Sequence, residues 1–256
     1  MKNFDNKVAV ITGAGSGIGR SLALALAQRG ARLALSDIDT AGVADVKNEF
    51  GQVNLVFNNA GVALSADVKD MEWDDFDWLM NINFWGVAHG TKAFLPHLIE
   101  SGDGHIVNVS SVFGLMGIPS QSAYNAAKFA VRGFTESLRQ EIRAAKFPVG
   151  VTCVHPGGIK TNIASSARGI PDGVDRETVR KGFQLMAITR PDSAARIILR
   201  GVEKNRPRVL IGPDARVFDA IPRIIGPRYE DLMAPFYGMG RYGIGKKIAG
   251  RFGIEL

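Results

Sequence analysis

The chain has 256 residues, 46% of them hydrophobic, and a formal net charge of +6, so it can form one large α/β domain or two small ones. No run of about 18 apolar residues appears, which argues against a transmembrane helix, and the first residues lead into an apolar strand without the core of a secretory signal. The single cysteine, Cys153, excludes an intrachain disulfide and is expected to be a buried, unreactive thiol. These features predict a cytoplasmic protein.

The positive charge is concentrated toward the C-terminus. Residues 196–256 contain twelve Lys or Arg and six acidic residues, whereas residues 1–195 are neutral overall. Nucleic-acid-binding proteins usually gather such charge in a recognisable module. None is visible, so we expect a basic solvated surface and no nucleic-acid partner.

Short apolar runs rich in Val and Ile alternate with helix-like segments, which is the pattern of parallel βαβ units. We expect strands near residues 7–12, 32–37, 53–57, 104–109, 149–154 and 207–211. Their almost continuous hydrophobicity is typical of a parallel sheet covered by helices on both faces. The sequence therefore predicts a single doubly wound α/β domain over residues 1–256.

Three longer helices are predicted between these strands. The first begins near Gly17 and is capped at Gly30. A second covers residues 72–100 and is interrupted or ended near Pro96, because proline breaks the helical hydrogen-bond pattern. The third covers residues 120–146, where apolar residues at intervals of three and four form one buried stripe.

Two segments depart from the βα pattern. Residues 157–190 are rich in Gly, Pro and Ser, and we expect a long substrate loop there with a short helix near 176–187. Residues 213–256 form a basic tail whose last part mixes aromatics, glycines and cations. Because glycines weaken a helix, we expect this tail to pack over the substrate cleft or a partner subunit, with contact to a membrane surface as the alternative.

A glycine-rich turn joins the first strand to the first helix. Glycines let the backbone turn tightly and approach a pyrophosphate, while the helix N-terminus offers free N–H groups and a positive dipole end. A glycine turn without a ligand is the alternative, but a Val-rich strand before it and an Ala/Leu-rich helix after it favour dinucleotide binding. The candidate cofactor-binding residues of this turn are Gly13, Gly15, Ser16, Gly17, Ile18 and Gly19.

The spacing of three of these glycines is Gly-x-x-x-Gly-x-Gly, and in this the sequence resembles the short-chain dehydrogenase/reductase family. Further motifs described below follow the family's order over residues 5–212. The resemblance implies a Rossmann-type fold, an NAD(P)-dependent oxidoreductase and a homo-oligomer, either a dimer or a tetramer.

The second predicted strand ends at Asp37. A carboxylate there can accept hydrogen bonds from the adenosine ribose hydroxyls and repels a 2′-phosphate, which favours NAD over NADP. The alternative is a structural Asp that starts a turn or helix.

A candidate proton-transfer pair lies in the helix predicted over 120–146. Tyr124 and Lys128 are four residues apart and therefore share one helix face. A neighbouring ammonium can lower the pKa of a phenol from about 10 toward the working range. Ser111 ends the strand near 104–109, where active-site groups of open α/β sheets gather, and its hydroxyl can stabilise charge on a substrate oxygen. A Tyr and a Lys at this spacing are by themselves consistent with exposed surface residues that have no catalytic role. The thirteen-residue interval from Ser111 to Tyr124, however, matches the family.

The resemblance also implies further site residues. Asn83 matches the family's fourth catalytic position, which helps to hold a water for proton relay, although a structural role for Asn83 or its neighbour Asn81 is the alternative. His155 is interpreted as a strand-end polar residue and not as a base. The remaining cofactor-binding positions carried over from the family, besides Tyr124 and Lys128, are Asn59, Ala60, Gly61, Pro156, Gly157, Ile159 and Thr161.

The chain is short after Asp37. Family members generally place a helix, a strand and another helix where this chain has only residues 38–52. We expect one crossover helix near 40–50, so the second strand becomes the sheet edge and one wall of the adenine pocket is missing.

Together these patterns predict transfer of a hydride between NAD and a secondary alcohol or ketone, with no metal. The segment Val112–Ile118 carries no charge, so an apolar, uncharged substrate is expected. Two alternatives remain: a nucleotide-binding sensor or scaffold that has lost turnover, and an NADP-dependent carbonyl reductase.

Overall fold

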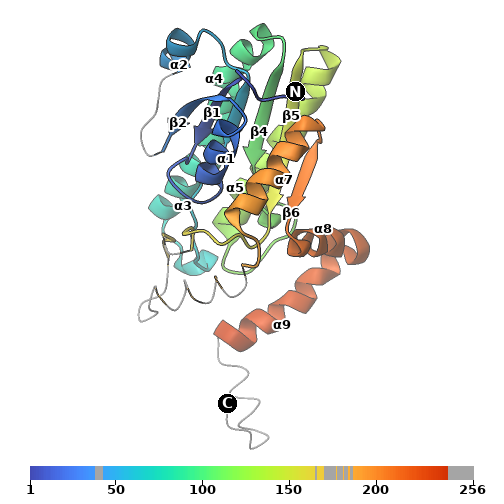
Figure 1. Cartoon of the computed structure of the whole chain (residues 1–256). Helices are drawn as coiled ribbons and strands as arrows, with labels where there is room; N and C mark the ends of the chain where they lie inside the picture. The colour runs from blue at the N-terminus through green and yellow to red at the C-terminus, as the bar shows by residue number, and fades with distance from the viewer. Residues whose placement is uncertain are drawn as a thin grey trace, which may run out of the picture.

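The computed structural model describes residues 1–37, 43–164, 166–169, 177, 181, 184 and 187–241. Six parallel strands form one sheet in the order β2-β1-β3-β4-β5-β6, with helices on both faces (Figure 1). The strands are β1 Val8–Thr12, β2 Arg32–Ser36, β3 Leu55–Asn58, β4 Gly104–Val109, β5 Val149–Pro156 and β6 Arg208–Ile211. The predicted doubly wound parallel sheet is confirmed.

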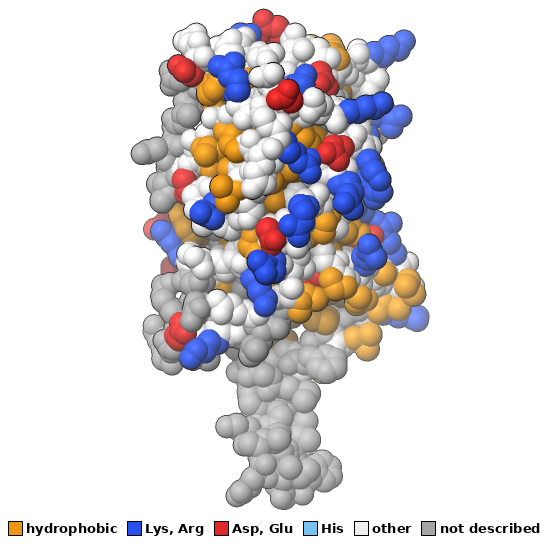
Figure 2. All heavy atoms as spheres, in the orientation of Figure 1, with side chains coloured by type: hydrophobic (Ala, Val, Ile, Leu, Met, Phe, Trp, Pro, Cys, Tyr) orange, Lys and Arg blue, Asp and Glu red, His pale blue; other side chains and the backbone are white. Residues whose placement is uncertain are grey.

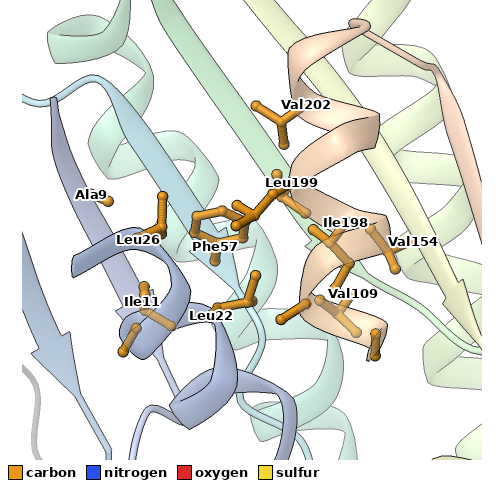
Figure 3. Close-up of a cluster of buried hydrophobic side chains, with 14 of the residues drawn as sticks. Ala9, Ile11, Leu22, Leu26, Phe57, Val109, Val154, Ile198, Leu199 and Val202 are labelled. Atoms are coloured by element: carbon orange, nitrogen blue, oxygen red, sulfur yellow. The ribbon is translucent and has the colours of Figure 1, made fainter. Parts of the chain in front are cut away.

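One face of the sheet is covered by α1 (Gly17–Ala27) and α7 (Pro191–Glu203). Figure 3 shows side chains of these two helices meeting over the strands, with Phe57 of β3 between them. The opposite face is covered by α2 (Val43–Phe50), α4 (Gly86–Glu100) and α5 (Ser122–Ala144). Because both faces are buried, strands with almost continuous apolar sequence are stable there.

Glycine caps the first helix as predicted. After α1 the backbone N–H of Gly30 donates to the Ala27 carbonyl, and the N–H of Ala31 donates to the Leu26 carbonyl. Gly30 has φ +76°, the left-handed conformation that this cap requires.

The helix predicted over residues 72–100 is interrupted elsewhere than predicted. It consists of α3 (Trp73–Met80), a π-helical turn at Asn81–Trp85, and α4. Pro96 lies inside α4, so the prediction of a break or end near Pro96 is wrong. A proline removes only one backbone donor, and the burial of Phe94 and Leu98 keeps this part of the helix against the sheet.

The second strand lies at the sheet edge, as the short connection predicted. β1 pairs with β2 on one side and with β3 on the other. Within the described ranges no strand lies outside β2, and Leu35 on it is 50% exposed. The crossover is α2, and the residues between β2 and α2, 38–42, lie outside the described residues.

The predicted tail contains two helices, α8 (Pro213–Ile225) and α9 (Tyr229–Arg241), joined by a 3₁₀ turn at Gly226–Arg228. Residues 242–256 and most of the helix predicted near 176–187 lie outside the described residues. Lys and Arg side chains are spread over the face that Figure 2 shows, interspersed with acidic ones. No helix in the described part of the chain is long and apolar enough to cross a membrane.

Candidate active site

The segments predicted to carry the site follow β1, β3, β4 and β5. These four strands are parallel neighbours, so their carboxyl ends lie at one edge of the sheet (Figure 1). This edge is where ligands bind in open α/β sheets.

The glycine-rich turn after β1 has a backbone that larger residues would disturb. Gly13 and Gly17 have φ +66° and +51°, and a Cβ at Gly19 would lie 2.1 Å from the Gly13 carbonyl oxygen. At the start of α1, Ser16 makes no side-chain cap hydrogen bond and the first turn contains no acidic residue. The turn thus offers backbone N–H groups and a positive helix end, which suits a pyrophosphate.

Asn59 and Ala60, which follow β3, brace this turn. The Thr12 hydroxyl accepts hydrogen bonds from the backbone N–H groups of Asn59 and Ala60, both at 3.0 Å. The Asn59 side-chain amide donates to the carbonyls of Thr12 at 3.0 Å and Gly13 at 3.2 Å. These bonds hold the start of the glycine-rich turn against the segment that follows β3.

Asp37 lies against the same turn. Its carboxylate accepts a hydrogen bond from the Gly15 N–H at 2.6 Å, although the side chain remains exposed. A Cβ at Gly15 would be 2.7 Å from the Asp37 carboxylate. The structure therefore places a negative charge at the edge of the turn, at the end of β2.

Ser111 and Tyr124 are brought together at the end of β4. Burial raises the pKa of Tyr124 to about 12, and the nearby Ser111 hydroxyl has a smaller, opposite effect on that pKa. Ser111 Oγ also accepts from the Phe113 N–H at 3.2 Å and so caps the 3₁₀ turn Val112–Gly114.

Lys128 lies one turn along α5 from Tyr124. Its Nζ is 5.6 Å from the centroid of the Tyr124 ring and donates to the Val109 carbonyl at 3.1 Å. The side chain is only 3% exposed, and burial lowers its pKa to about 8. The sequence predicts that Lys128 lowers the pKa of Tyr124. This prediction is wrong, because burial raises the pKa of Tyr124 and lowers that of Lys128.

Asn83 lies in the π-helical turn, a feature found frequently at functional sites. Its side-chain nitrogen donates to the Val62 carbonyl at 2.9 Å, and its oxygen accepts from the Val62 N–H at 2.8 Å. A Cβ at Gly61 would lie 3.2 Å from Asn83 Oδ1 and 3.5 Å from Lys128 Nζ. Asn83 Oδ1 and Lys128 Nζ therefore both lie beside the space that a side chain at residue 61 would occupy.

The segment after β5 returns to the glycine turn. Ile159 pairs with Thr189 in an isolated bridge, and the methyl of Thr161 would be 2.9 Å from a Cβ at Gly17. Pro156 ends β5, and Gly157 follows it. The predicted nicotinamide-side residues and the predicted phosphate turn therefore lie side by side.

Sequence analysis did not single out Asp214 or Tyr229. Asp214 accepts a hydrogen bond from the Gly158 N–H, and the Tyr229 hydroxyl accepts one from the Gly117 N–H. His155, interpreted above as a strand-end polar residue, is buried with Nδ1 2.9 Å from the Ser111 carbonyl oxygen. Contacts this distant along the chain leave no local pattern. The one signal available was Gly-Pro-Asp at 212–214, which is typical of a helix start.

A family model described as short chain dehydrogenase matches residues 7–49 and 36–171. The chain belongs to the short-chain dehydrogenase/reductase family. It is 49% identical to SadH of Mycobacterium tuberculosis, which is named as an oxidoreductase, over 91% of this chain and 96% of that protein. It is therefore an NAD(P)-dependent oxidoreductase of this family.

Solved structures agree with the fold. The chain is similar to a short-chain dehydrogenase/reductase from Burkholderia phymatum in complex with NAD, with a TM-score of 0.79 and 29% identity over 92% of this chain and 97% of that one. It is also similar to levodione reductase, with a TM-score of 0.71 and 26% identity over 84% of this chain and 99% of that one. In the described part of the chain, no group of three or more His, Cys, Asp or Glu could hold a metal ion.

Proposed function

We propose that the protein oxidises an uncharged, largely apolar secondary alcohol with NAD, or catalyses the reverse reduction of the ketone. The observation that carries this proposal is the convergence of Ser111, Tyr124 and Lys128 at the end of β4, on the same edge of the sheet as the glycine-rich turn. When bound, the nicotinamide supplies or accepts the hydride.

The three side chains would handle the substrate oxygen and its proton. With a pKa of about 12, the Tyr124 hydroxyl is protonated at neutral pH and can donate its proton to the substrate oxygen during reduction. Ser111 Oγ, close to Tyr124, would orient the same oxygen. Lys128, with a pKa of about 8, exchanges a proton near neutral pH and can resupply Tyr124. Asn83 would support this relay by holding the segment after β3.

NAD is the proposed cofactor. The glycine-rich turn leaves space that side chains would fill, and Asp37 places a carboxylate at the end of β2. That carboxylate would accept hydrogen bonds from ribose hydroxyls and disfavour a 2′-phosphate. The NAD bound by the Burkholderia relative supports the same choice.

The aromatic side chains near Tyr124 support an apolar substrate. Phe113 packs edge-on against the Tyr124 ring with centroids 6.0 Å apart, and Phe218 of α8 lies 6.2 Å beyond Phe113. A charged substrate placed here would lose hydration without gaining a partner. One structural neighbour is named levodione reductase, and a reductase of that kind agrees with this substrate class.

We also propose a homo-oligomer that works in the cytoplasm. Trp85 at the end of the π-helical turn and Phe129 on α5 are 48% and 40% exposed, large apolar surfaces that a second copy would cover. The single free cysteine is buried, as suits a reducing compartment.

The reaction is tested by following NAD reduction with a panel of secondary alcohols. Cyclic, aryl and medium-chain alcohols should give higher kcat/KM than a polyol or a hydroxy acid, and the Tyr124→Phe variant serves as the matched control. Preference for either polar class would refute the substrate assignment, and activity only with NADP would refute the cofactor assignment.

A further inference from the structure

The side chain of His155 reaches from β5 to the segment that carries Ser111. β5 pairs in parallel with β4, and the last pair of that ladder joins Val109 and Val154. The Ser110 N–H makes one more main-chain hydrogen bond, to the Val154 carbonyl at 2.8 Å. Beyond Ser110, no main-chain hydrogen bond joins the two segments within the described residues. Ser111 therefore lies just past the point where the sheet holds the backbone.

The imidazole ring of His155 provides the next hydrogen bond between the two segments. Its Nδ1 lies 2.9 Å from the Ser111 carbonyl oxygen. Burial lowers the pKa of His155 to about 4, so the ring is neutral at neutral pH. A neutral imidazole has one protonated nitrogen, and a carbonyl oxygen can only accept. Nδ1 therefore carries the proton and donates it to the Ser111 carbonyl.

The other ring nitrogen of His155 gives no second anchor. Nε2 is buried and has no hydrogen-bond partner in the part of the chain that the structure describes. A buried polar atom without a partner lowers stability, and an apolar side chain of similar size would avoid that loss. Packing alone therefore does not account for a histidine at this position. The Nδ1 bond to Ser111 is the contribution of the imidazole that an apolar side chain could not make.

The Ser111 carbonyl and hydroxyl belong to one small hydrogen-bonded unit. The carbonyl also accepts from the Gly114 N–H at 3.0 Å, within the 3₁₀ turn Val112–Gly114. The hydroxyl oxygen accepts from the Phe113 N–H at 3.2 Å. Only Cβ separates that oxygen from the Ser111 backbone, so a displaced backbone moves the hydroxyl. Misplacement of a group at the reacting centre by about 1 Å can lower a rate about a hundredfold.

We propose that His155 is a positioning residue, which fixes the backbone of Ser111 through the Nδ1 hydrogen bond and so aims the Ser111 hydroxyl at the substrate oxygen. His155 does not touch the substrate and exchanges no proton with it. The proposal rests on the proposed function, because it takes Ser111 as the residue that orients the substrate oxygen.

Two substitutions separate the hydrogen bond from packing. His155→Leu fills a similar volume and removes the donor, whereas His155→Asn is smaller and places an amide donor where Nδ1 lies. The kcat for a secondary alcohol should fall on the order of tenfold or more in His155→Leu and stay within about threefold in His155→Asn. His155→Asn should nevertheless have the lower Tm of the two, because it leaves a cavity. A kcat that follows Tm overturns the proposal.

A double substitution tests whether His155 acts through Ser111. Independent effects multiply, whereas a residue that acts only through the Ser111 hydroxyl has no effect on kcat once that hydroxyl is gone. In the Ser111→Ala background, His155→Leu should therefore change the remaining kcat by less than about twofold. The same factor in both backgrounds overturns the proposal.

His105→Leu is the matched control. His105 is also a buried histidine, but it lies near the start of β4, whereas Ser111 follows the end of that strand. Its replacement should lower Tm and leave kcat within about twofold of the parent, because the backbone of Ser111 keeps its contacts. A fall in kcat as large as that of His155→Leu would make the effect one of general stability and would overturn the proposal.

The hydrogen bond is also measured without turnover. In parent protein that contains histidine labelled with nitrogen-15, NMR should show a protonated Nδ1 and a bare Nε2 for His155 at neutral pH, and the reverse tautomer overturns the proposal. The amides of Phe113 and Gly114, which donate to Ser111, should exchange with solvent about threefold faster or more in His155→Leu but not in His155→Asn. Unchanged exchange in His155→Leu also overturns the proposal. If these measurements agree but no alcohol reduces NAD, the proposed function is wrong and the positioning of Ser111 by His155 stands.

Discussion

The Asp214 carboxylate accepts a hydrogen bond from the backbone N–H of Gly158 at 2.6 Å. A Cβ at the neighbouring Gly157 would lie 2.1 Å from the same carboxylate, so a larger residue there would displace Asp214. Asp214 is in the first turn of α8, whereas Gly157 and Gly158 directly follow β5. This contact joins the C-terminal helices to the segment proposed to face the nicotinamide.

Replacing Asp214 should therefore affect cofactor use through the position of that segment. Asp214→Ala leaves the Gly158 N–H without its partner, which costs about 1–3 kcal/mol of stability. We expect KM for NAD to rise more than kcat falls, and Asp214→Asn, which retains an acceptor oxygen, to recover most of the loss. The control is Asp192→Ala, an acidic residue in the first turn of α7 whose side chain is 47% exposed. An unchanged KM for NAD, with only a lower Tm, would reduce Asp214 to a purely structural residue.

Removing the Tyr124 hydroxyl should abolish turnover but not cofactor binding. Tyr124→Phe deletes the proton donor and keeps the ring that packs against Phe113. General acid–base catalysis contributes about 10²–10⁴-fold, so kcat should fall by about that factor. The dissociation constant for NAD, measured by titration, should change only within about a few fold. Turnover at about a tenth of the parent rate or more would contradict the assignment.

Cofactor choice should depend on Asp37. Its carboxylate at the end of β2 disfavours a 2′-phosphate, so the parent should show a higher kcat/KM with NAD than with NADP. Asp37→Ala and Asp37→Arg should raise the relative activity with NADP, more so for Arg, which can pair with the phosphate. Asp70→Ala is a control at an exposed acidic residue outside the turn. A parent enzyme that already prefers NADP would refute this role.

The sheet could be predicted because its signals are local. Apolar runs mark all six strands, and the short interval after Asp37 has room for a single helix, which leaves β2 at the edge as found. The π-helical turn at Asn81–Trp85 carries no sequence signal. The sequence therefore predicts the interruption of the 72–100 helix at Pro96 instead.

Contacts of the C-terminal helices could be predicted only in outline. Glycines near the end of α9 argued against a helix, yet α9 extends to Arg241 and makes tertiary contacts through Tyr229 and Tyr237. Such packing outweighs an intrinsic propensity of about 1 kcal/mol per glycine. The pKa shifts of Tyr124 and Lys128 could not be predicted from the sequence either, because they depend on the burial of both groups in the fold.

Two buried histidines should make the fold sensitive to acid. Burial lowers the pKa of His105 to about 3 and that of His155 to about 4. Each also has one ring nitrogen without a hydrogen-bond partner in the described part of the chain. In the unfolded chain both have a pKa near 6.5, so below that pH the unfolded state binds more protons than the folded state.

The stability that the two neutral histidines contribute is therefore fully present above pH of about 6.5. It is lost as the pH falls toward 4 and then 3. Between pH of about 7 and about 5, each histidine should cost about 2 kcal/mol of unfolding free energy. Carboxylates with ordinary pKa values near 4 stay mostly ionised over this interval, so the histidines dominate the change.

Urea unfolding at both pH values measures this effect. His105→Gln, at a buried position in β4 that hydrogen-bonds Thr152, should remove about half of the pH dependence. His89→Gln replaces an exposed histidine and should retain the full parental dependence. If His105→Gln loses as much stability between the two pH values as the parent does, His105 is not a buried neutral imidazole that resists protonation.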